Sequence, residues 1–286
     1  MIAFGWIDLS VASLQSCPFT RRNSSVENSE YPVTAERKDK ICALLKGIET
    51  GDPASVAVVN QDQYIQHNPE THEGGEGLAA LFKRLSKTSP RVNIVRIFSD
   101  GDFVFGHTEY DFSTSRVGFE VFRFEADQTV EHWDNIQSRR APNLSGHSMV
   151  DGPTDVRDFE HTESNRARIK EFVQTVLIGR RIDKLPQYIS EPYIEHNPRL
   201  SDGLLTLQNA LGLQGTDSKP VICYEKLHRI LAEGNFVLTV CEGYLEGVHT
   251  SFYDLFRIEA SKIVEHWDTT EKVVPRSEWN NDNGKF

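Results

Sequence analysis

The chain contains the same two motifs twice, in the same order and at nearly the same spacing. Tyr-Ile-x-His-Asn-Pro begins at Tyr64 and again at Tyr193, and Val-Glu-His-Trp-Asp begins at Val130 and again at Val264. The offsets are 129 and 134 residues, so the whole stretch between the motifs recurs with a few residues inserted. A period of about 130 residues is longer than a solenoid repeat and has the length of a domain. The chain is therefore predicted to be two copies of one small domain.

Composition shifts suggest where the two copies begin and end. The N-terminal segment becomes rich in Ser, Asn, Arg and Glu before the first helical pattern, which predicts disorder. A stretch with Pro142, Gly146 and Pro153 separates the copies and is predicted to be a linker. The resulting boundaries are an extra segment at 1–33, a first domain at 34–138, a linker at 139–157, and a second domain with a tail at 158–286.

Charge and composition exclude several classes of partner. The net charge of −11 argues against a nucleic-acid partner, which needs a basic surface. No run approaches the roughly 18 apolar residues of a membrane span, so no membrane partner is expected. The four cysteines are scattered without metal-like spacing, which favours free thiols in a reducing cytoplasm.

Within each copy, a helical pattern comes first and a strand pattern follows. Apolar residues recur at helical spacing from Ile41 to Ile48 and again from Ile169 to Leu177. The period then changes to two, with Asp-Gly-Asp and Glu-Gly-Asn turns at Gly101 and Gly234. The pattern predicts an α+β domain with antiparallel strands near Val92–Phe98, Phe103–Phe112, Gly118–Glu125 and Thr129–Gln137, and in the second copy near Cys223–Leu231, Phe236–Tyr244, Ser251–Ile258 and Lys262–Asp268.

These motifs resemble the SnoaL-like branch of the NTF2-like superfamily. The resemblance rests on Tyr-Ile-x-His-Asn-Pro, a Gly-Asp/Asn-Phe-Val hairpin, Phe-Arg and Glu-His-Trp-Asp, and covers roughly residues 35–138 and 160–270. It implies two tandem cone-shaped α+β barrels, each with helices packed on a curved antiparallel sheet around a pocket. It also implies pairing through the sheets, as an internal pseudo-dimer and also as a homodimer. The name-giving members are polyketide cyclases, which close a ring by aldol condensation without a cofactor, so none is expected here.

The third strand of each copy carries a candidate catalytic carboxylate. Glu120 and Asp254 stand at the position where cyclases of this family have a pocket-facing acidic residue, and Phe122 and Phe256 follow on the same face. Burial would raise the pKa of such a carboxyl and suit it to proton abstraction. The resemblance also implies a pocket histidine in the strand of His107. The alternative is that the carboxylates pair with neighbouring cations.

Alternation on the last strand leaves two orientations open. If His faces inward, His132 with Asp134 and His266 with Asp268 line the two pockets. If Trp faces inward, Glu131 and Glu265 take their place, and the histidines are structural. The tryptophans are also suited to covering a dimer surface.

The first motif of each copy adds substrate-binding candidates. His67 and His196 are expected either at the pocket mouth or as hydrogen-bonded supports of the turn. Tyr64 and Tyr193 either place hydroxyls in the pocket or pack there. A metal site from His67, His132 and Asp134 is disfavoured because no ligand-spaced pair lies on one helix, so no metal is predicted.

Two classes of function follow from these candidates. The leading hypothesis is a cofactor-free acid/base enzyme of the aldol cyclase, isomerase or lyase type, acting on a small hydrophobic carbonyl compound. The alternative is a non-catalytic ligand-binding or assembly module in which the sheets join the two copies. The groups that face the pocket discriminate between them, because catalysis needs a carboxylate within hydrogen-bond reach of a histidine or tyrosine.

Overall fold

The computed structural model describes residues 31–286 and contains two α+β units in tandem, which confirms the predicted fold class. Residues 1–30 of the segment expected to be disordered lie outside the described residues, and 31–33 belong to the first helix. The first unit contains α1 (Tyr31–Thr50), β1 (Ile65–Gln66), α2 (Gly74–Leu85), β2 (Arg91–Asp100), β3 (Phe103–Asp111), β4 (Ser115–Glu125) and β5 (Gln128–Ser138). The second contains α3 (Thr162–Phe172), β6 (Ile189–Glu195), α4 (Leu204–Gly212), β7 (Ile222–Glu233), β8 (Phe236–Leu245), β9 (Val248–Glu259) and β10 (Lys262–Lys272).

Each unit has one five-stranded sheet with the same topology. The strand orders are β1-β5-β4-β3-β2 and β6-β10-β9-β8-β7. The four long strands are antiparallel, as predicted, and the short strand that carries the Tyr-Ile-x-His motif pairs parallel with the last strand. Because of that pairing, the motif's Gln66 or Glu195 lies beside the histidine of the Glu-His-Trp-Asp motif.

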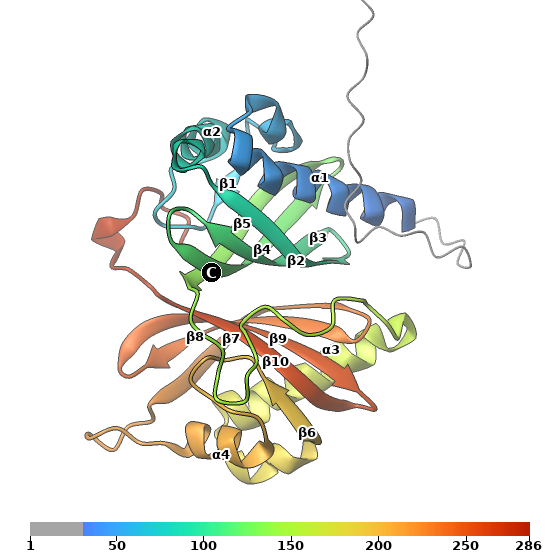
Figure 1. The fold of residues 1–286 in the computed structure, drawn as a ribbon, viewed down its shortest axis with the longest axis vertical. Coiled ribbons are helices and arrows are strands. Elements are labelled where there is room, and N and C mark those ends of the chain that lie inside the picture. Colours follow the sequence, from blue (N-terminus) through green and yellow to red (C-terminus); the bar gives the residue numbers. More distant parts are fainter. Residues whose placement is uncertain (1–30) are drawn as a thin grey trace, which may run out of the picture.

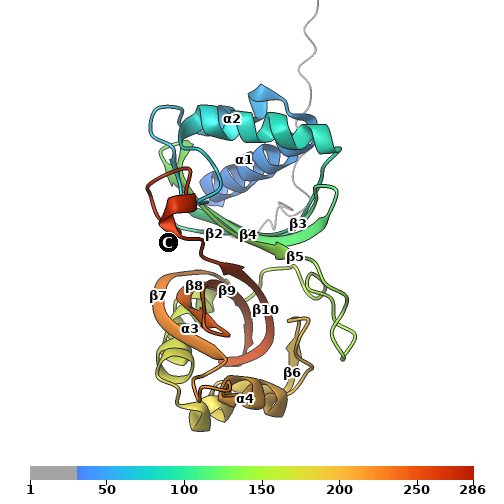
Figure 2. The same ribbon diagram turned by 90° about the vertical axis from the view of Figure 1, so that its left-hand side faces the viewer.

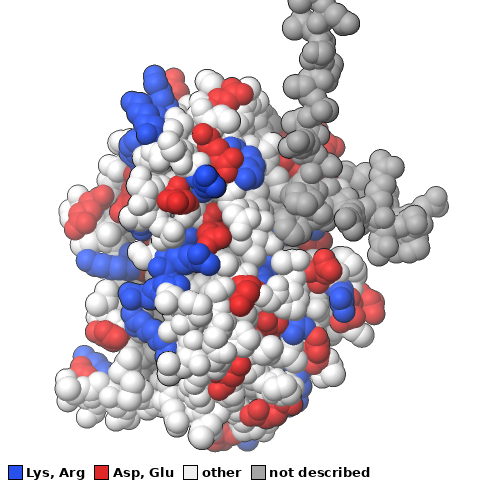
Figure 3. Space-filling view, in the orientation of Figure 1, with Lys and Arg blue, Asp and Glu red and all other residues white. Residues whose placement is uncertain are grey.

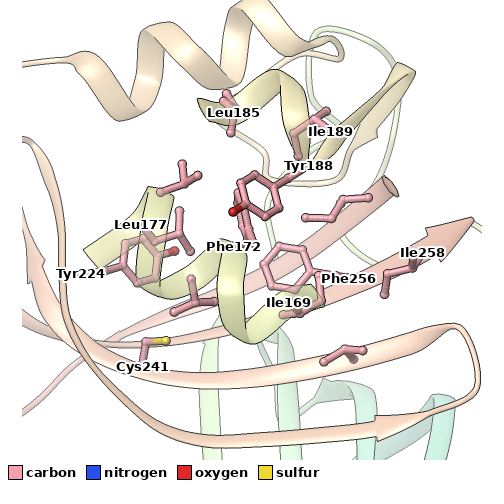
Figure 4. Close-up of a cluster of buried hydrophobic side chains, with 14 of the residues drawn as sticks. Ile169, Phe172, Leu177, Leu185, Tyr188, Ile189, Tyr224, Cys241, Phe256 and Ile258 are labelled. Atoms are coloured by element: carbon pink, nitrogen blue, oxygen red, sulfur yellow. The ribbon is translucent and has the colours of Figure 1, made fainter. Parts of the chain in front are cut away.

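The two sheets pack against each other, and the helices cover their other faces (Figures 1 and 2). Three apolar clusters correspond to these layers. One lies between helices and sheet in each unit, and Figure 4 shows the cluster of the second unit around Phe172 and Phe256. The third contains side chains from both sheets, including Trp133 and Trp267. Each sheet therefore buries both of its faces, which explains why the central strands are so rich in apolar residues.

The contact between the sheets follows an approximate two-fold symmetry. Asn135 and Thr269 are equivalent residues of the two copies, and each hydrogen-bonds the other across the interface. Gln137 accepts the backbone N–H of Thr270, and its equivalent Glu271 accepts the backbone N–H of Ile136. Reciprocal contacts between equivalent residues are the mark of an isologous interface, here within one chain.

Each interface tryptophan is stacked between a histidine of its own unit and an arginine of the other. The guanidinium of Arg229 lies 3.7 Å from the ring centroid of Trp133, and that of Arg96 lies 4.3 Å from Trp267. On the opposite side, His67 stacks on Trp133 and His196 on Trp267, each with 4.6 Å between ring centroids. A cation over a desolvated indole contributes about 2 kcal/mol, so these stacks join the two units as well as filling space.

The hairpins at the ends of the sheets also exchange ion pairs. Asp100, at the end of β2, binds Arg166 of α3 at 2.6 Å and accepts the backbone N–H of Ala232. Its equivalent Glu233 binds Lys38 of α1 at 2.7 Å and accepts the backbone N–H of Ser99. Each acidic residue thus ties the first helix of the other unit to the interface.

The segment after the last strand of each unit lies against the other unit. After β5, the linker brings the carbonyl oxygen of Ser148 to 2.7 Å from Nδ1 of His196. After β10, the tail brings the carbonyl oxygen of Gly284 to 2.9 Å from Nδ1 of His67. Of the apolar residues of the tail, Trp279 and Phe286, we expected packing on the second copy, and Phe286 does so by stacking on His228. Residues 280–285 lie on the first copy.

The surface carries an uneven distribution of charge. On the face drawn in Figure 3, Lys and Arg side chains gather beside the junction of the two units, although the whole chain has a net charge of −11. Within residues 31–286, no helix combines the length and the apolar character that crossing a membrane requires.

The interface generates the first prediction. Trp267 is fully buried, so Trp267→Ala should lower the free energy of unfolding by about 3–5 kcal/mol. Leu144→Ala is the control, because Leu144 is 98 % exposed in the linker and should change stability by less than about 0.5 kcal/mol. Chemical denaturation followed by tryptophan fluorescence and circular dichroism measures both. Equal, small effects would mean that Trp267 is not buried.

Candidate functional site

A cavity of about 560 Å³ lies between the helices and the sheet of the first unit. Its apolar wall comes from α1, α2, β3, β4 and β5. Its polar residues come from the sheet, the loop after β1, α2 and the tail, and include Asn68, Thr71, Arg84, Tyr110, Arg116, Glu120, His132, Asp134 and Lys285. The apolar lining includes Leu44, Leu45, Ile48, Leu78, Leu81, Phe82, Phe112, Phe122 and Ile136.

Glu120 and His132 form a hydrogen-bonded pair at the cavity wall. The two side chains come from adjacent strands, and Glu120 Oε2 lies 2.7 Å from His132 Nε2. The other oxygen of Glu120 accepts the hydroxyl of Tyr110 at 2.6 Å, and Phe122 stacks on the His132 ring at 4.4 Å. Burial raises the pKa of Glu120 above its ordinary value, and the hydrogen bond from His132 only partly opposes this.

Gln66 determines which nitrogen of His132 carries a proton. The side-chain oxygen of Gln66 accepts the backbone N–H of Asn68 at 2.8 Å, so it also acts as the acceptor for His132 Nδ1, 3.0 Å away. Nδ1 therefore bears a hydrogen. The bond between Nε2 and Glu120 then shares one further proton, which lies either on the imidazole or on the carboxyl. Such a pair can take up or release a proton.

Asp134, two residues after His132, faces the same cavity. One of its oxygens accepts the amide N–H of Asn68 at 2.7 Å, and the other lies 3.4 Å from the ammonium of Lys285. The inward orientation of His and Asp on the last strand is therefore the one that the structure adopts. Trp133, between them, faces the second unit.

Tyr64 contributes a hydroxyl that is free to bind a ligand. The side chain is buried and lines the cavity, yet its oxygen has no hydrogen-bond partner among the described residues. Burial raises the pKa of Tyr64 well above its ordinary value, with Glu120 and Asp134 adding to the effect, so the group stays an O–H donor.

The second unit holds a related polar network with a different charge. Asp254 lies 3.1 Å from His266 Nε2 and accepts the hydroxyl of Tyr224 at 3.0 Å. The other ring nitrogen of His266 lies 2.9 Å from Glu195, which stands where the first unit has Gln66. Burial alone would lower the pKa of His266, but Glu195 and Asp254 outweigh it and raise that pKa well above its ordinary value. His266 is therefore held as a cation between two carboxylates.

Tyr193 and Asp268 complete the polar network of the second unit. The hydroxyl of Tyr193 donates to Glu195 at 2.8 Å, whereas its equivalent Tyr64 has no partner among the described residues. Burial also raises the pKa of Asp268 to about 7, although His266 and the amide of Asn197 favour its ionised form. Phe256 stacks on His266 as Phe122 does on His132.

The structure places three predicted residues away from the polar networks. His107, expected in the first pocket, lies on the opposite face of the sheet, where it stacks on Phe119 and bonds Arg96 at 3.1 Å. Burial and the charge of Arg96 lower its pKa well below the ordinary value. His67 and His196 bond Glu131 and Glu265 and stack on the tryptophans, so they support the interface.

Sequence reasoning missed five participants in these networks. Tyr110 and Tyr224 come from different strands in the two copies, so the repeat gave no signal for them. The contrast between Gln66 and Glu195 was visible in the motifs, and it acquires meaning only from the hydrogen bonds to the adjacent histidine. Lys285 lies in the tail, far from the motifs in sequence.

Two groups of side chains bring three metal-ligating atoms within 4.8 Å of one another: Glu120, His132 and Asp134, and His147, Asp151 and His196. In the first, both nitrogens of the histidine are already hydrogen-bonded, and the ammonium of Lys285 supplies a cation beside Asp134. A metal ion would have to displace that lysine and a shared proton. The set of His67, His132 and Asp134, which the sequence disfavoured, does not converge, because His67 stacks on the interface tryptophan.

Comparison with solved structures finds proteins similar to part of the chain. TsrD from Streptomyces laurentii is 18% identical, with 36% of this chain and 89% of that chain covered and a TM-score of 0.33. An LEH-like epoxide hydrolase from M. tuberculosis is 22% identical, with 37% and 86% covered and a TM-score of 0.33. IdmH, a putative polyketide cyclase from Streptomyces antibioticus, is 16% identical, with 35% and 91% covered and a TM-score of 0.32. No protein-family model and no curated protein matches the chain.

The raised pKa of Asp268 generates a prediction about stability and pH. The folded state keeps this proton up to about pH 7, whereas the unfolded chain releases it near pH 4. Folding stability therefore falls as the pH rises through that window, by roughly 4 kcal/mol if the group acts alone. Asp268→Asn removes the titration and preserves a hydrogen bond with Asn197. Its melting temperature, relative to the unmodified chain, should rise between pH 4 and pH 7.5.

The control for this measurement is Asp217→Asn, at an exposed turn. It should leave the pH dependence of the melting temperature unchanged. If the melting temperature of Asp268→Asn depends on pH in the same way as that of the unmodified chain, Asp268 titrates as an ordinary carboxyl.

Proposed function

We propose that the first unit is a cofactor-free acid/base catalyst that acts on a small hydrophobic carbonyl compound. The observation that supports this most directly is the connected chain of Tyr110, Glu120, His132 and Gln66 at the wall of a cavity whose helical side is largely apolar. Its volume of about 560 Å³ is within the range for small-molecule sites, roughly 300–1,000 Å³.

In this proposal Glu120 removes a proton from the carbon next to the carbonyl group. Its raised pKa makes it a stronger base once ionised, and Glu120 is ionised when the proton of its 2.7 Å bond to His132 lies on the imidazole. The electron pair of the broken C–H bond moves to the carbonyl oxygen, which becomes an enolate. The free hydroxyl of Tyr64 is suited to donate a hydrogen bond to that oxygen.

The fate of the enolate decides the reaction class. Return of the proton to a different carbon is an isomerisation, and attack of the enolate carbon on a second carbonyl of the same molecule is an aldol ring closure. In the aldol case the proton held by Glu120 and His132 passes to the new alkoxide. Both reactions use the same base and the same oxygen donor, so one cavity suits either.

The non-catalytic alternative suits the second unit better than the first. There His266 is held as a cation by Glu195 and Asp254, and Tyr193 is already bonded. A fixed ion network of this kind stabilises one arrangement of the strands and keeps His266 protonated near neutral pH. We infer that the second unit acts as the assembly partner of the first.

The test uses exchange of α-protons for deuterium, which reports enolate formation without knowledge of the final product. Hydrophobic ketones are first screened for binding by thermal shift, and exchange of bound compounds is followed by proton NMR. Glu120→Gln should keep the fold and the affinity and slow exchange by about 100-fold or more. Asp254→Asn, the equivalent change in the second unit, should leave exchange unchanged. Loss of exchange in Asp254→Asn alone would assign the activity to the second unit, and no exchange at all would leave a binding protein.

A second prediction concerns the residue that distinguishes the two histidines. Gln66→Glu copies the second unit, because it places a carboxylate beside His132 and offers Tyr64 an acceptor. Exchange should slow by about 100-fold, the usual effect of losing one oxyanion donor, because Tyr64 would donate its hydroxyl to the new carboxylate instead of to the enolate oxygen. Glu195→Gln is the matched control and should not slow exchange. Unchanged exchange in Gln66→Glu would show that the Tyr64 hydroxyl does not bind the enolate oxygen.

A further inference from the structure

The tail after β10 completes the wall of the first cavity. Asn280 donates its backbone N–H to Pro69, Asn281 donates its amide to Asn68 and Thr71, and Asn283 donates to the carbonyl of Gln66. These bonds fix the segment that leads to Lys285. A segment of the second unit thereby delivers a side chain to the site of the first.

Lys285 is a buried lysine that lines the cavity. Its side chain is 1 % exposed, and its ammonium lies 2.8 Å from Glu271 and 3.4 Å from Asp134. Burial would lower the pKa of Lys285, but the two carboxylates outweigh it and raise that pKa, so the group is a cation. An ammonium has three N–H donors, and the described residues supply two acceptors. One donor remains for a ligand.

The second unit has a neutral pair at the equivalent place. The carbonyl of Ser148 contacts His196 as that of Gly284 contacts His67, so the following residues, Met149 and Lys285, correspond. Met149 is buried, and its sulfur lies 3.8 Å from the amide of Gln137, which is the equivalent of Glu271. The two sites therefore share a backbone arrangement, and only the first has a cation in it.

We propose that Lys285 binds the oxygen of the substrate in the first cavity and stabilises the negative charge that forms there. This inference rests on the proposed function and extends it to the substrate class, which is a carbonyl compound that reacts through an enolate. The lysine forms no covalent bond and keeps its protons. Its third N–H donates to the oxygen, together with Tyr64, and this bond strengthens as the charge develops.

The groups for proton abstraction and for oxygen binding both lie close to Asp134. The acid/base atoms of Glu120 and His132 lie within 4.8 Å of an Asp134 oxygen, and Lys285 lies 3.4 Å from Asp134. A substrate that spans from the base to the ammonium therefore needs only its reacting carbon and carbonyl oxygen in this region. The rest of the molecule occupies the apolar part of the cavity.

The variant that tests this is Lys285→Met combined with Glu271→Gln. Removing the lysine alone would leave a buried carboxylate unpaired and destabilise the fold. The double change instead reproduces the Met149–Gln137 pair. The introduced glutamine can still accept the backbone N–H of Ile136, as Gln137 accepts that of Thr270. The melting temperature of the double variant should stay close to that of the unmodified chain.

Two measurements on the full chain decide the question. The first is α-proton exchange of a ketone that binds, which the double variant should slow by about 100-fold or more with little change in KM. The second is binding of a naphthol above and below its own pKa, since the naphtholate carries an enolate-like oxygen. The unmodified chain should prefer the anion, and the double variant should lose that preference. Met149→Lys with Gln137→Glu, which places the charged pair in the second unit, is the control and should change neither quantity.

Each outcome has one meaning. Exchange and naphtholate preference both unchanged in the folded double variant would overturn the role of Lys285 and leave the proposed function in place. Naphtholate preference that depends on Lys285, with no exchange by the unmodified chain, would support the oxygen site and overturn the catalytic function. A loss of exchange equalled by a loss of neutral-ketone affinity would overturn the specific role, because it would show that Lys285 only shapes the cavity.

Discussion

The structure depends on the burial of the outer face of each sheet against the other. That contact covers Trp133 and Trp267, seats an arginine of the other unit on each indole, and pairs Asn135 with Thr269 at the approximate two-fold axis. A sheet with one apolar face in the middle of the molecule must present the other face to its helices. Because side chains alternate along a strand, placing the tryptophan outward places His132 and His266 inward. The dimer-like contact therefore sets the polarity of both sites.

The sequence was sufficient for the repeat, the fold class and the approximate strands, because two motifs at a nearly constant offset and a change from helical to alternating period are local signals. It left open which side chains of the last strand face the pocket, since both faces of that strand carry a large or charged residue. Only the second unit resolves this, by covering Trp133. The same burial accounts for the misplaced His107. The resemblance put it in the pocket, whereas the outer face of its strand is buried by the other unit and holds it against Arg96.

Other features could not be predicted because they arise from contacts that are distant in sequence. Lys285 reaches Asp134 over 151 residues, and the tail that carries it shares no pattern with the motifs. A signal existed in the repeat itself. Gln137 and Glu271 are equivalent, so a charge appears in one copy that the other lacks, and an unpaired buried Glu needs a cation nearby. That argument would have pointed to a basic partner for Glu271 without saying where in the chain it lies.

The two units have diverged in charge while keeping the same backbone. The second site holds His266 between Glu195 and Asp254, which fixes its proton, and has Met149 where a ligand oxygen would need a donor. The first replaces one carboxylate by Gln66 and the methionine by Lys285, which leaves one shared proton, a free tyrosine hydroxyl and a free ammonium donor around one cavity. These are different solutions to burying polar groups. In the second network the histidine and tyrosine donors are all taken by carboxylates, whereas in the first two donors remain for a molecule that enters. Because the tail of the second unit supplies one of these donors, the first site requires the contact between the sheets as well as its own fold.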